Sequence, residues 1–180
     1  MTTGSSHSLP EPHCGAGVTG MIRVGHGIDV HPFAPGRALV LAGVSISSPR
    51  GLDGHSDADV VTHALCDALL GAAGLQDIGY WFPSSDTQYR NIRSIGLLDR
   101  VVAMVRDKGW VVVNADISIL AREPKLQPHF DAMRVVLSTH LGVVPDAVGI
   151  KATTTESLGF VGRGEGIEAH AVCLLSSKSD

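Results

Sequence analysis

Aromatic residues and cysteines are scarce in this sequence, and no part of it is apolar for long. Phe, Trp and Tyr make up 4% of the 180 residues, so we expect a core built mainly from Val, Ile, Leu and Ala. The three cysteines, Cys14, Cys66 and Cys173, lie far apart without a C-x-x-C pair. They argue against a disulfide framework or a cysteine zinc site and favour the reducing cytoplasm. No window approaches the roughly 18 apolar residues of a membrane span, so no membrane partner is expected.

Charge of one sign is not concentrated anywhere in the chain. The formal net charge is −4, and no basic run or basic–aromatic alternation occurs, so nucleic acid is not an expected partner. A polyphosphate ligand would need metal cations to offset this acidic balance. With 44% apolar and 18% charged residues, the composition is typical of one ordered globular domain.

The first 20 residues differ in composition from the rest. They are rich in Gly, Ser, Pro and Thr, and they lack the basic start and apolar centre of a secretory signal. Such a segment buries too little apolar surface to become ordered. We therefore predict a flexible extension over residues 1–20, a folded domain over 21–176 and a short tail over 177–180.

Hydrophobic periodicity, interrupted by Gly and Pro, predicts an α+β domain. The expected strands cover residues 21–31, 38–46, 110–121, 147–155 and 166–175, and the expected helices cover residues 55–74, 94–108 and 126–142. The first helix is expected to begin with Ser56 as its N-cap. This pattern favours a mixed α/β sandwich, with a mostly antiparallel or mixed sheet and three helices on one face. The other face then needs a cover, for which a second copy of the chain is the simplest candidate.

Asp29 and His31 lie two residues apart in a predicted strand, so both side chains point to one face. The following helix presents His63 on the same side as Asp59 and Asp67, each four residues away. An Asp–His–His set with one open position is typical of a catalytic zinc site, and a carboxylate on that helical face could orient the histidine. Hydrogen-bonded, half-buried histidines are the alternative. Spacing alone does not decide between them.

A second polar cluster lies in the segment "KATTTESLGFVGRGEG", residues 151–166. Three threonines at the end of a predicted strand, followed by Glu156, offer donors to an anion and a carboxylate to a cation. The glycine-rich end adds backbone N–H groups that suit an anion. Taken alone, the same residues also fit a helix cap and a tight turn.

Four segments together resemble the 2-C-methyl-D-erythritol 2,4-cyclodiphosphate synthases. They read "GHGIDVHPF", "GHSDADVVTHALCDALLGAAGLQDIGYWFP", "PKLQPH" and "KATTTESLGFVGRGEG", and the resemblance covers residues 22–175. It implies cyclisation of 4-diphosphocytidyl-2-C-methyl-D-erythritol 2-phosphate with release of CMP, on the non-mevalonate route to isoprenoids. It also implies a homotrimer whose sheets surround the three-fold axis and whose sites are each shared by two subunits.

The resemblance assigns roles to individual residues. The metal ligands it implies are Asp29, His31 and His63 for Zn²⁺ and Glu156 for Mg²⁺ or Mn²⁺. The transition-state stabilisers it implies are His55 and Thr154. The substrate-binding residues it implies are Asp29, His31, His55, Ser56, Asp77, Ile78, Gly79, Phe82, Asp86, Ala121, Pro124, Lys125, Leu126, Thr153, Thr154, Thr155, Glu156, Phe160 and Arg163.

Two segments depart from the family pattern. The chain reads FPSSD where the family commonly has F-P-D-T-D, which favours Asp86 as a binding residue over Ser84 and Ser85. In the loop implied for cytidine it reads AREPKL, with Arg122 and Glu123 where smaller residues are common.

Two other classes of function compete with the cyclisation. In a zinc-dependent phosphate-ester hydrolase, the open metal position would activate water instead of orienting a phosphate. In a non-catalytic trimeric binding protein the zinc would be structural, but a structural zinc usually has four protein ligands and only three are predicted here.

Overall fold

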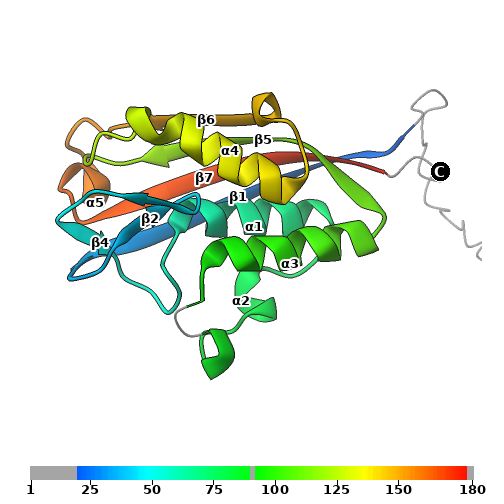
Figure 1. Cartoon of the computed structure of the whole chain (residues 1–180), viewed down its shortest axis with the longest axis horizontal. Coiled ribbons are helices and arrows are strands. Elements are labelled where there is room, and N and C mark those ends of the chain that lie inside the picture. The colour runs from blue at the N-terminus through cyan, green and yellow to red at the C-terminus, as the bar shows by residue number, and fades with distance from the viewer. Residues whose placement is uncertain (1–19, 90–91, 178–180) are drawn as a thin grey trace, which may run out of the picture.

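The computed structural model describes residues 20–89 and 92–177, which form an α+β fold (Figure 1). Its five-stranded sheet has the order β4-β1-β7-β5-β6. The strands are β1 (Ile22–Pro35), β4 (Arg50–Leu52), β5 (Trp110–Leu120), β6 (Val148–Thr153) and β7 (Gly166–Ser177). All neighbouring pairs are antiparallel except β5 and β6, which run parallel. The predicted fold class, with a mixed sheet, is confirmed.

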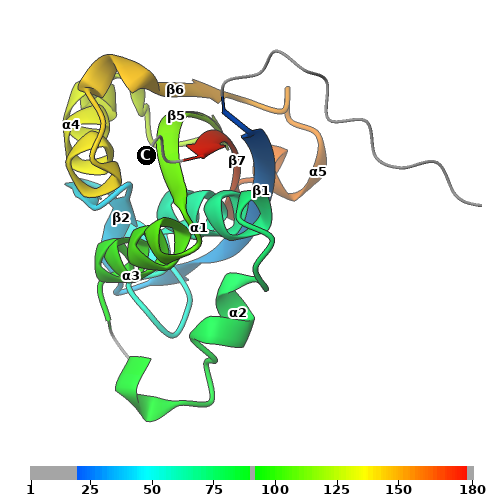
Figure 2. The ribbon, with the colours of Figure 1, turned by 90° about the vertical axis from the view of Figure 1, so that its right-hand side faces the viewer.

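Three main helices lie on one face of the sheet, as predicted (Figures 1 and 2). They are α1 (Val60–Ala72), α3 (Ser94–Asp107) and α4 (Phe130–Leu141). Helix α1 packs on β1 and β7 and is covered in turn by α3, whereas α4 packs on β6. Ten of the 13 residues of α1 are buried, which explains why this helix lacks a polar face.

The observed elements differ from the predicted ones in several places. The predicted strand over 38–46 is a hairpin, β2 (Leu39–Leu41) and β3 (Val44–Ile46), because Ala42 and Gly43 both adopt positive φ and turn the chain. Helix α1 begins after Asp59 rather than Ser56, because the Asp59 carboxylate accepts the hydrogen bond of the Thr62 N–H. The short elements that were not predicted are β4, α2 (Ile78–Trp81), α5 (Gly159–Gly162) and the 3₁₀ turns η1 (Thr87–Tyr89) and η3 (Pro145–Ala147). The helix predicted over 126–142 begins as a 3₁₀ turn, η2 (Gln127–His129), before α4.

Two glycines of β1 allow α1 to lie very close to the sheet. A Cβ atom on Gly25 would lie 1.8 Å from a carbonyl oxygen of α1, and one on Gly27 would lie 2.1 Å from another. No larger residue fits either position unless the helix moves away. This close approach brings His63 of α1 within reach of the next residues of β1.

The opposite face of the sheet is left uncovered by the residues that the structure describes. Five large apolar side chains lie exposed there, and we call them the outer apolar face: Ile22, Val24, Ile28, Val30 and Val172. Val24 is 66% exposed. A sheet face with several exposed apolar side chains is typical of a surface that packs against another protein surface.

The predicted extension and tail lie outside the described residues, except for Gly20 and Ser177. The domain boundaries therefore stay predictions. Among the helices described, none has the length and hydropathy needed to cross a membrane.

Candidate functional site

Three side chains predicted as metal ligands converge between β1 and α1. His31 Nε2 lies 3.0 Å from Asp29 Oδ2, His63 Nδ1 lies 3.1 Å from the same oxygen, and the two nitrogens are 3.3 Å apart. Within residues 20–89 and 92–177, no other group of three His, Cys, Asp or Glu side chains brings its ligand atoms so close together. We call these three residues the triad.

The spacing of the three atoms fits one face of a tetrahedral metal site. Bonds of about 2.0–2.1 Å from zinc to nitrogen or oxygen place neighbouring ligand atoms of a tetrahedron about 3.3 Å apart. The observed separations of 3.0, 3.1 and 3.3 Å are close to that value. No fourth ligand atom comes from the described residues, so one position would stay open to a substrate.

Hydrogen bonds on the far side of each imidazole direct one ring nitrogen into the triad. His31 Nδ1 is 2.5 Å from the Asp53 carbonyl oxygen, so Nδ1 carries the proton and Nε2 offers its lone pair. His63 has the opposite arrangement: its Nδ1 faces Asp29, and its Nε2 lies 2.8 Å from Ser94 Oγ. The two histidines therefore offer different ring nitrogens to the same point.

The triad concentrates negative charge on Asp29. Burial alone would raise the pKa of Asp29, but hydrogen bonds and positive charge from His31 and His63 outweigh burial and hold this pKa well below its usual range. Burial would also lower the pKa of His31, but the contact with Asp29 raises it above its ordinary value. The carboxylate is therefore anionic, and a bound cation would replace a proton held between these side chains.

The carboxylates predicted to orient His63 have other partners, so that prediction is wrong. Asp59 caps α1 and accepts hydrogen bonds from two N–H groups of the β2–β3 turn, at 2.8 and 2.6 Å. Asp67 accepts the hydrogen bond of the first N–H of α2, at 2.7 Å. Both carboxylates are held by backbone N–H groups that only the tertiary structure brings near. The spacing of four residues could not reveal these competing donors.

A pocket of about 170 Å³ lies beside the two histidines of the triad. The predicted residues that line it are His31, His55, Ser56, His63, Ile78, Gly79 and Phe82. Ser84, which lies in the implied loop 82–86 but was disfavoured relative to Asp86, also lines it, and so do Tyr89, Ile92 and Leu97, which were not predicted. These additional residues come from the segment after α2 and from α3, and no local motif connects them to the triad.

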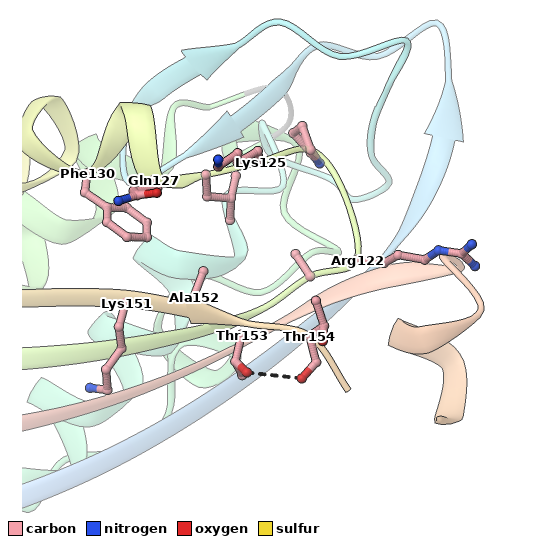
Figure 3. A pocket seen from close by; sticks show the side chains of 11 residues that line it. Arg122, Lys125, Gln127, Phe130, Lys151, Ala152, Thr153 and Thr154 are labelled. Atoms are coloured by element: carbon pink, nitrogen blue, oxygen red, sulfur yellow. Dashed lines mark hydrogen bonds between the residues drawn. The ribbon is translucent and has the colours of Figure 1, made fainter. Parts of the chain in front are cut away.

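A second pocket, of about 500 Å³, lies beside the end of β6 (Figure 3). The predicted residues that line it are Ala121, Pro124, Lys125, Leu126, Thr153 and Thr154. Arg122 and Gln127 of the same loop also line it, and so do Phe130, Lys151 and Ala152, which were not predicted. Apolar side chains together with lysines and threonine hydroxyls suit a ligand that has a flat apolar part and an anionic part.

Comparison with known proteins connects this geometry to a family, since the YgbB family profile matches residues 22–176. The chain belongs to the YgbB family. The 2-C-methyl-D-erythritol 2,4-cyclodiphosphate synthase of Moorella thermoacetica is 55% identical over 154 residues, which cover 86% of this chain and 94% of that protein. The family predicted from the motifs is thereby confirmed.

Solved structures of similar proteins share the fold. The bifunctional IspDF from Campylobacter jejuni matches with a TM-score of 0.85 and 42% identity, covering 88% of this chain and 43% of that one. The CDP complex of Plasmodium falciparum IspF matches with a TM-score of 0.77 and 31% identity, covering 88% of this chain and 97% of that one.

Several residues that the YgbB resemblance implied lie outside the linings of these two pockets. Asp77 caps α2, accepting the hydrogen bond of the Tyr80 N–H at 2.9 Å. Asp86 accepts the backbone N–H of Gln88 at 3.0 Å. Among the described residues of the FPSSD segment, the structure thus places Ser84 rather than Asp86 in the lining beside the triad.

The loop after β6 carries the remaining predicted residues of this YgbB chain. Thr154 Oγ1 donates a hydrogen bond to Glu156 Oε1 at 3.0 Å, and Thr155 Oγ1 donates one to the Leu158 carbonyl. Glu156 and Ser157 both have positive φ, 51° and 67°. Two consecutive non-glycine residues in this region are strained, which is typical of a loop held for binding. Two further predicted residues follow in and after α5: Phe160 and Arg163.

Of the two residues in which this chain departs from the YgbB family pattern, Arg122 lines the second pocket and Glu123 does not. In Figure 3 the Arg122 side chain extends from this lining toward α5, and its Nη1 donates to the Gly162 carbonyl at 3.1 Å. Glu123 pairs with Arg50 at 2.9 Å. These contacts tie the 121–127 loop to α5 and to β4.

The triad and the Thr154–Glu156 loop are positioned by strands that are three positions apart in the sheet. Strand β1 carries two triad residues, β6 leads into the loop, and β7 and β5 lie between them. Neighbouring strands are about 4.8 Å apart, so three such spacings separate β1 from β6 by about 14 Å. One YgbB chain alone therefore does not bring the two groups together.

Proposed function

We propose that this chain converts 4-diphosphocytidyl-2-C-methyl-D-erythritol 2-phosphate to 2-C-methyl-D-erythritol 2,4-cyclodiphosphate and CMP. The observation that carries the proposal is the triad with tetrahedral spacing, beside a pocket, in a chain of the YgbB family. An oxygen of the 2-phosphate forms a bond to the β-phosphorus. The bond from that phosphorus to the oxygen bridging to the α-phosphate breaks, and CMP leaves with this oxygen and its electron pair.

Asp29, His31 and His63 hold Zn²⁺ in this proposal, and Glu156 holds Mg²⁺ or Mn²⁺. One carboxylate and two neutral imidazoles leave a zinc ion with net positive charge, which suits a phosphate oxygen at the open position. Bound cations supply Lewis-acid charge, which offsets negative charge on the phosphates as CMP departs. The acidic chain itself has no cluster of basic residues to do this.

The two pockets divide the substrate between them. His55 and Ser56 offer polar groups to the methylerythritol phosphate, and Ile78 and Phe82 line the apolar side of the same pocket. The pocket beside β6 takes the cytidine diphosphate part. Lys125 and the hydroxyls of residues 153–155 donate to its phosphates. The CDP bound in the Plasmodium falciparum relative supports this assignment. Asp77, Gly79, Asp86, Phe160 and Arg163 keep the binding roles that the family resemblance implies.

Two residues are proposed to stabilise the charge that develops on the phosphates. His55 lies exposed on the loop before α1, and Thr154 lies exposed after β6. Each offers a donor where the phosphates would meet the cations. Removing one such donor costs roughly 10²–10³-fold in rate.

Analysis of the products tests the proposed reaction. Phosphorus NMR of substrate treated with the enzyme and metal should show one cyclic diphosphate for each CMP released. A zinc-dependent phosphate-ester hydrolase would instead use the open metal position to activate water and give an open-chain phosphate or inorganic phosphate. Either hydrolytic product in place of the cyclic diphosphate would overturn the assignment.

We infer further that three copies of the chain form a closed ring. A head-to-tail interface joins one edge of a sheet to the opposite edge of the next copy. In such a ring the triad of one subunit meets Thr154 and Glu156 of its neighbour. The two groups can meet only in this way, because β7 and β5 separate them within one chain. The outer apolar face of each sheet then turns toward the ring axis and loses its contact with water.

Glu156→Gln is expected to keep zinc and to lose the response to added Mg²⁺ or Mn²⁺. The amide keeps the shape of the side chain but removes the negative charge that a hard divalent cation prefers. We expect turnover to fall roughly 10²-fold, the scale of losing one charge-stabilising group. Glu123→Gln is the matched control, because Glu123 is an exposed glutamate that pairs with Arg50. If the metal titration of Glu156→Gln overlays that of this control, Glu156 does not bind the second cation.

A further inference from the structure

Helix α3 contributes one side chain to the surroundings of the triad. Ser94, its first residue, is 0% exposed and lies 31 positions after His63 in the chain. Ser94 Oγ lies 2.8 Å from His63 Nε2 and 2.5 Å from Asp57 Oδ1. The Ser94 backbone N–H also donates to Asp57 Oδ1, at 3.1 Å. A carboxylate, a hydroxyl and an imidazole are thus joined in a line that ends at the triad.

The direction of these hydrogen bonds follows from the atom that faces the triad. His63 points Nδ1 at Asp29, so a metal there takes the Nδ1 lone pair and the proton lies on Nε2. A serine hydroxyl can accept one hydrogen bond and donate another. Ser94 therefore accepts from Nε2–H and donates to Asp57. The other hydroxyl near Nε2 belongs to Ser56, at the longer distance of 3.2 Å.

We propose that Ser94 and Asp57 are positioning residues for the metal and act through His63. These two hydrogen bonds fix the orientation of the His63 ring and keep its proton on Nε2. The negative charge of Asp57 acts through the Ser94 hydroxyl and makes His63 Nδ1 a stronger metal ligand. His31 obtains the same support from the Asp53 backbone carbonyl, which side-chain substitution cannot remove. The line through Ser94 is therefore the support that mutation can test. This inference rests on the zinc site proposed above.

The test compares zinc affinity in three variants by competition with a chromogenic chelator. Ser94→Ala removes the hydroxyl and should weaken zinc binding about 10–100-fold, the usual effect of losing an outer partner of a ligand. Asp57→Asn keeps an acceptor but loses the charge, so its loss should be smaller. Ser138→Ala is the matched control: Ser138 is 3% exposed, and its Oγ donates to the Val135 carbonyl within α4. It should bind zinc like the parent.

A second measurement separates positioning from a general loss of stability. In the zinc-loaded parent, the His63 Nε2–H proton should be visible by NMR and exchange slowly with water, whereas in Ser94→Ala it should exchange fast. Thermal melting of the metal-free proteins should show similar losses in Ser94→Ala and Ser138→Ala, since each loses one buried hydroxyl.

The outcomes decide between the proposals. Parent-like zinc affinity in Ser94→Ala overturns the positioning role, and so does an unchanged rate of Nε2–H exchange. If Ser94→Ala does not fold without metal, Asp57→Asn decides: weaker zinc binding supports the role, and parent affinity overturns it. A parent protein that binds no zinc would instead refute the metal site itself.

Discussion

His63→Ala protein should fold like its parent, contain no zinc and form no measurable cyclic diphosphate. His63 supplies one of only three ligand atoms found at the site among the described residues, so its loss leaves two. Alanine suits the helical position, so α1 should persist. We expect activity to fall by at least the roughly 10²–10³-fold that follows removal of a single charge-stabilising group. Metal content by mass spectrometry and a thermal melt of the same sample measure both effects.

The matched control is His140→Ala. His140 Nδ1 lies 2.6 Å from Asp99 and joins α4 to α3, so this control also loses a histidine–aspartate contact on a helix. It should retain zinc and turnover. Stoichiometric zinc in folded His63→Ala protein would contradict the assignment of the ligand.

Mixing two inactive variants should restore activity if each site is shared between subunits. His63→Ala lacks one residue of the triad, which one subunit contributes to the shared site. Thr154→Ala lacks the hydroxyl that the neighbouring subunit contributes to it. Each variant alone should be nearly inactive, because every one of its sites lacks one group. In a mixed trimer, a subunit with intact His63 can lie next to one with intact Thr154. For random mixing in equal amounts, about a quarter of the sites contain both groups.

A second mixture provides the control for this experiment. The double variant His63→Ala with Thr154→Ala is mixed with parent in equal amounts by the same unfolding and refolding. A shared site again leaves about a quarter of the sites intact, whereas a site within one subunit leaves about half. If verified mixed trimers of the two single variants show no activity, each subunit carries its own complete site and the ring proposal fails.

Side chains that lie in one element, or in two elements with clear periodicity, could be placed from the sequence. Asp29 and His31 follow from the two-residue period of a strand, and His63 lies on a helix that the apolar pattern predicts. The spacing could not show that Asp59 and Asp67 would face away from His63 toward backbone donors. It also could not show Ser94, which approaches from a helix that begins 31 residues later.

The same limit explains the errors in the secondary structure. Ala42 and Gly43 form the turn of the β2–β3 hairpin, but an alanine with positive φ gives no signal in sequence. Its N–H group is held by the buried Asp59 carboxylate, a contact between residues 17 positions apart. Helix α2 is a single turn whose first N–H is held by Asp67. Both features depend on tertiary contacts rather than on local propensity.

The pairing of the first strand with the last has a consequence for how the protein is made. Ile22 pairs with Ser176, and Pro32 pairs with Gly166. The strand that bears Asp29 and His31 therefore leaves the ribosome long before its partner β7 exists. Contacts so distant in sequence slow folding, and an unpaired apolar strand is prone to aggregate in the meantime. A nascent chain that stops before residue 166 already contains all three residues of the triad but lacks β7, the strand that pairs with Asp29 and His31.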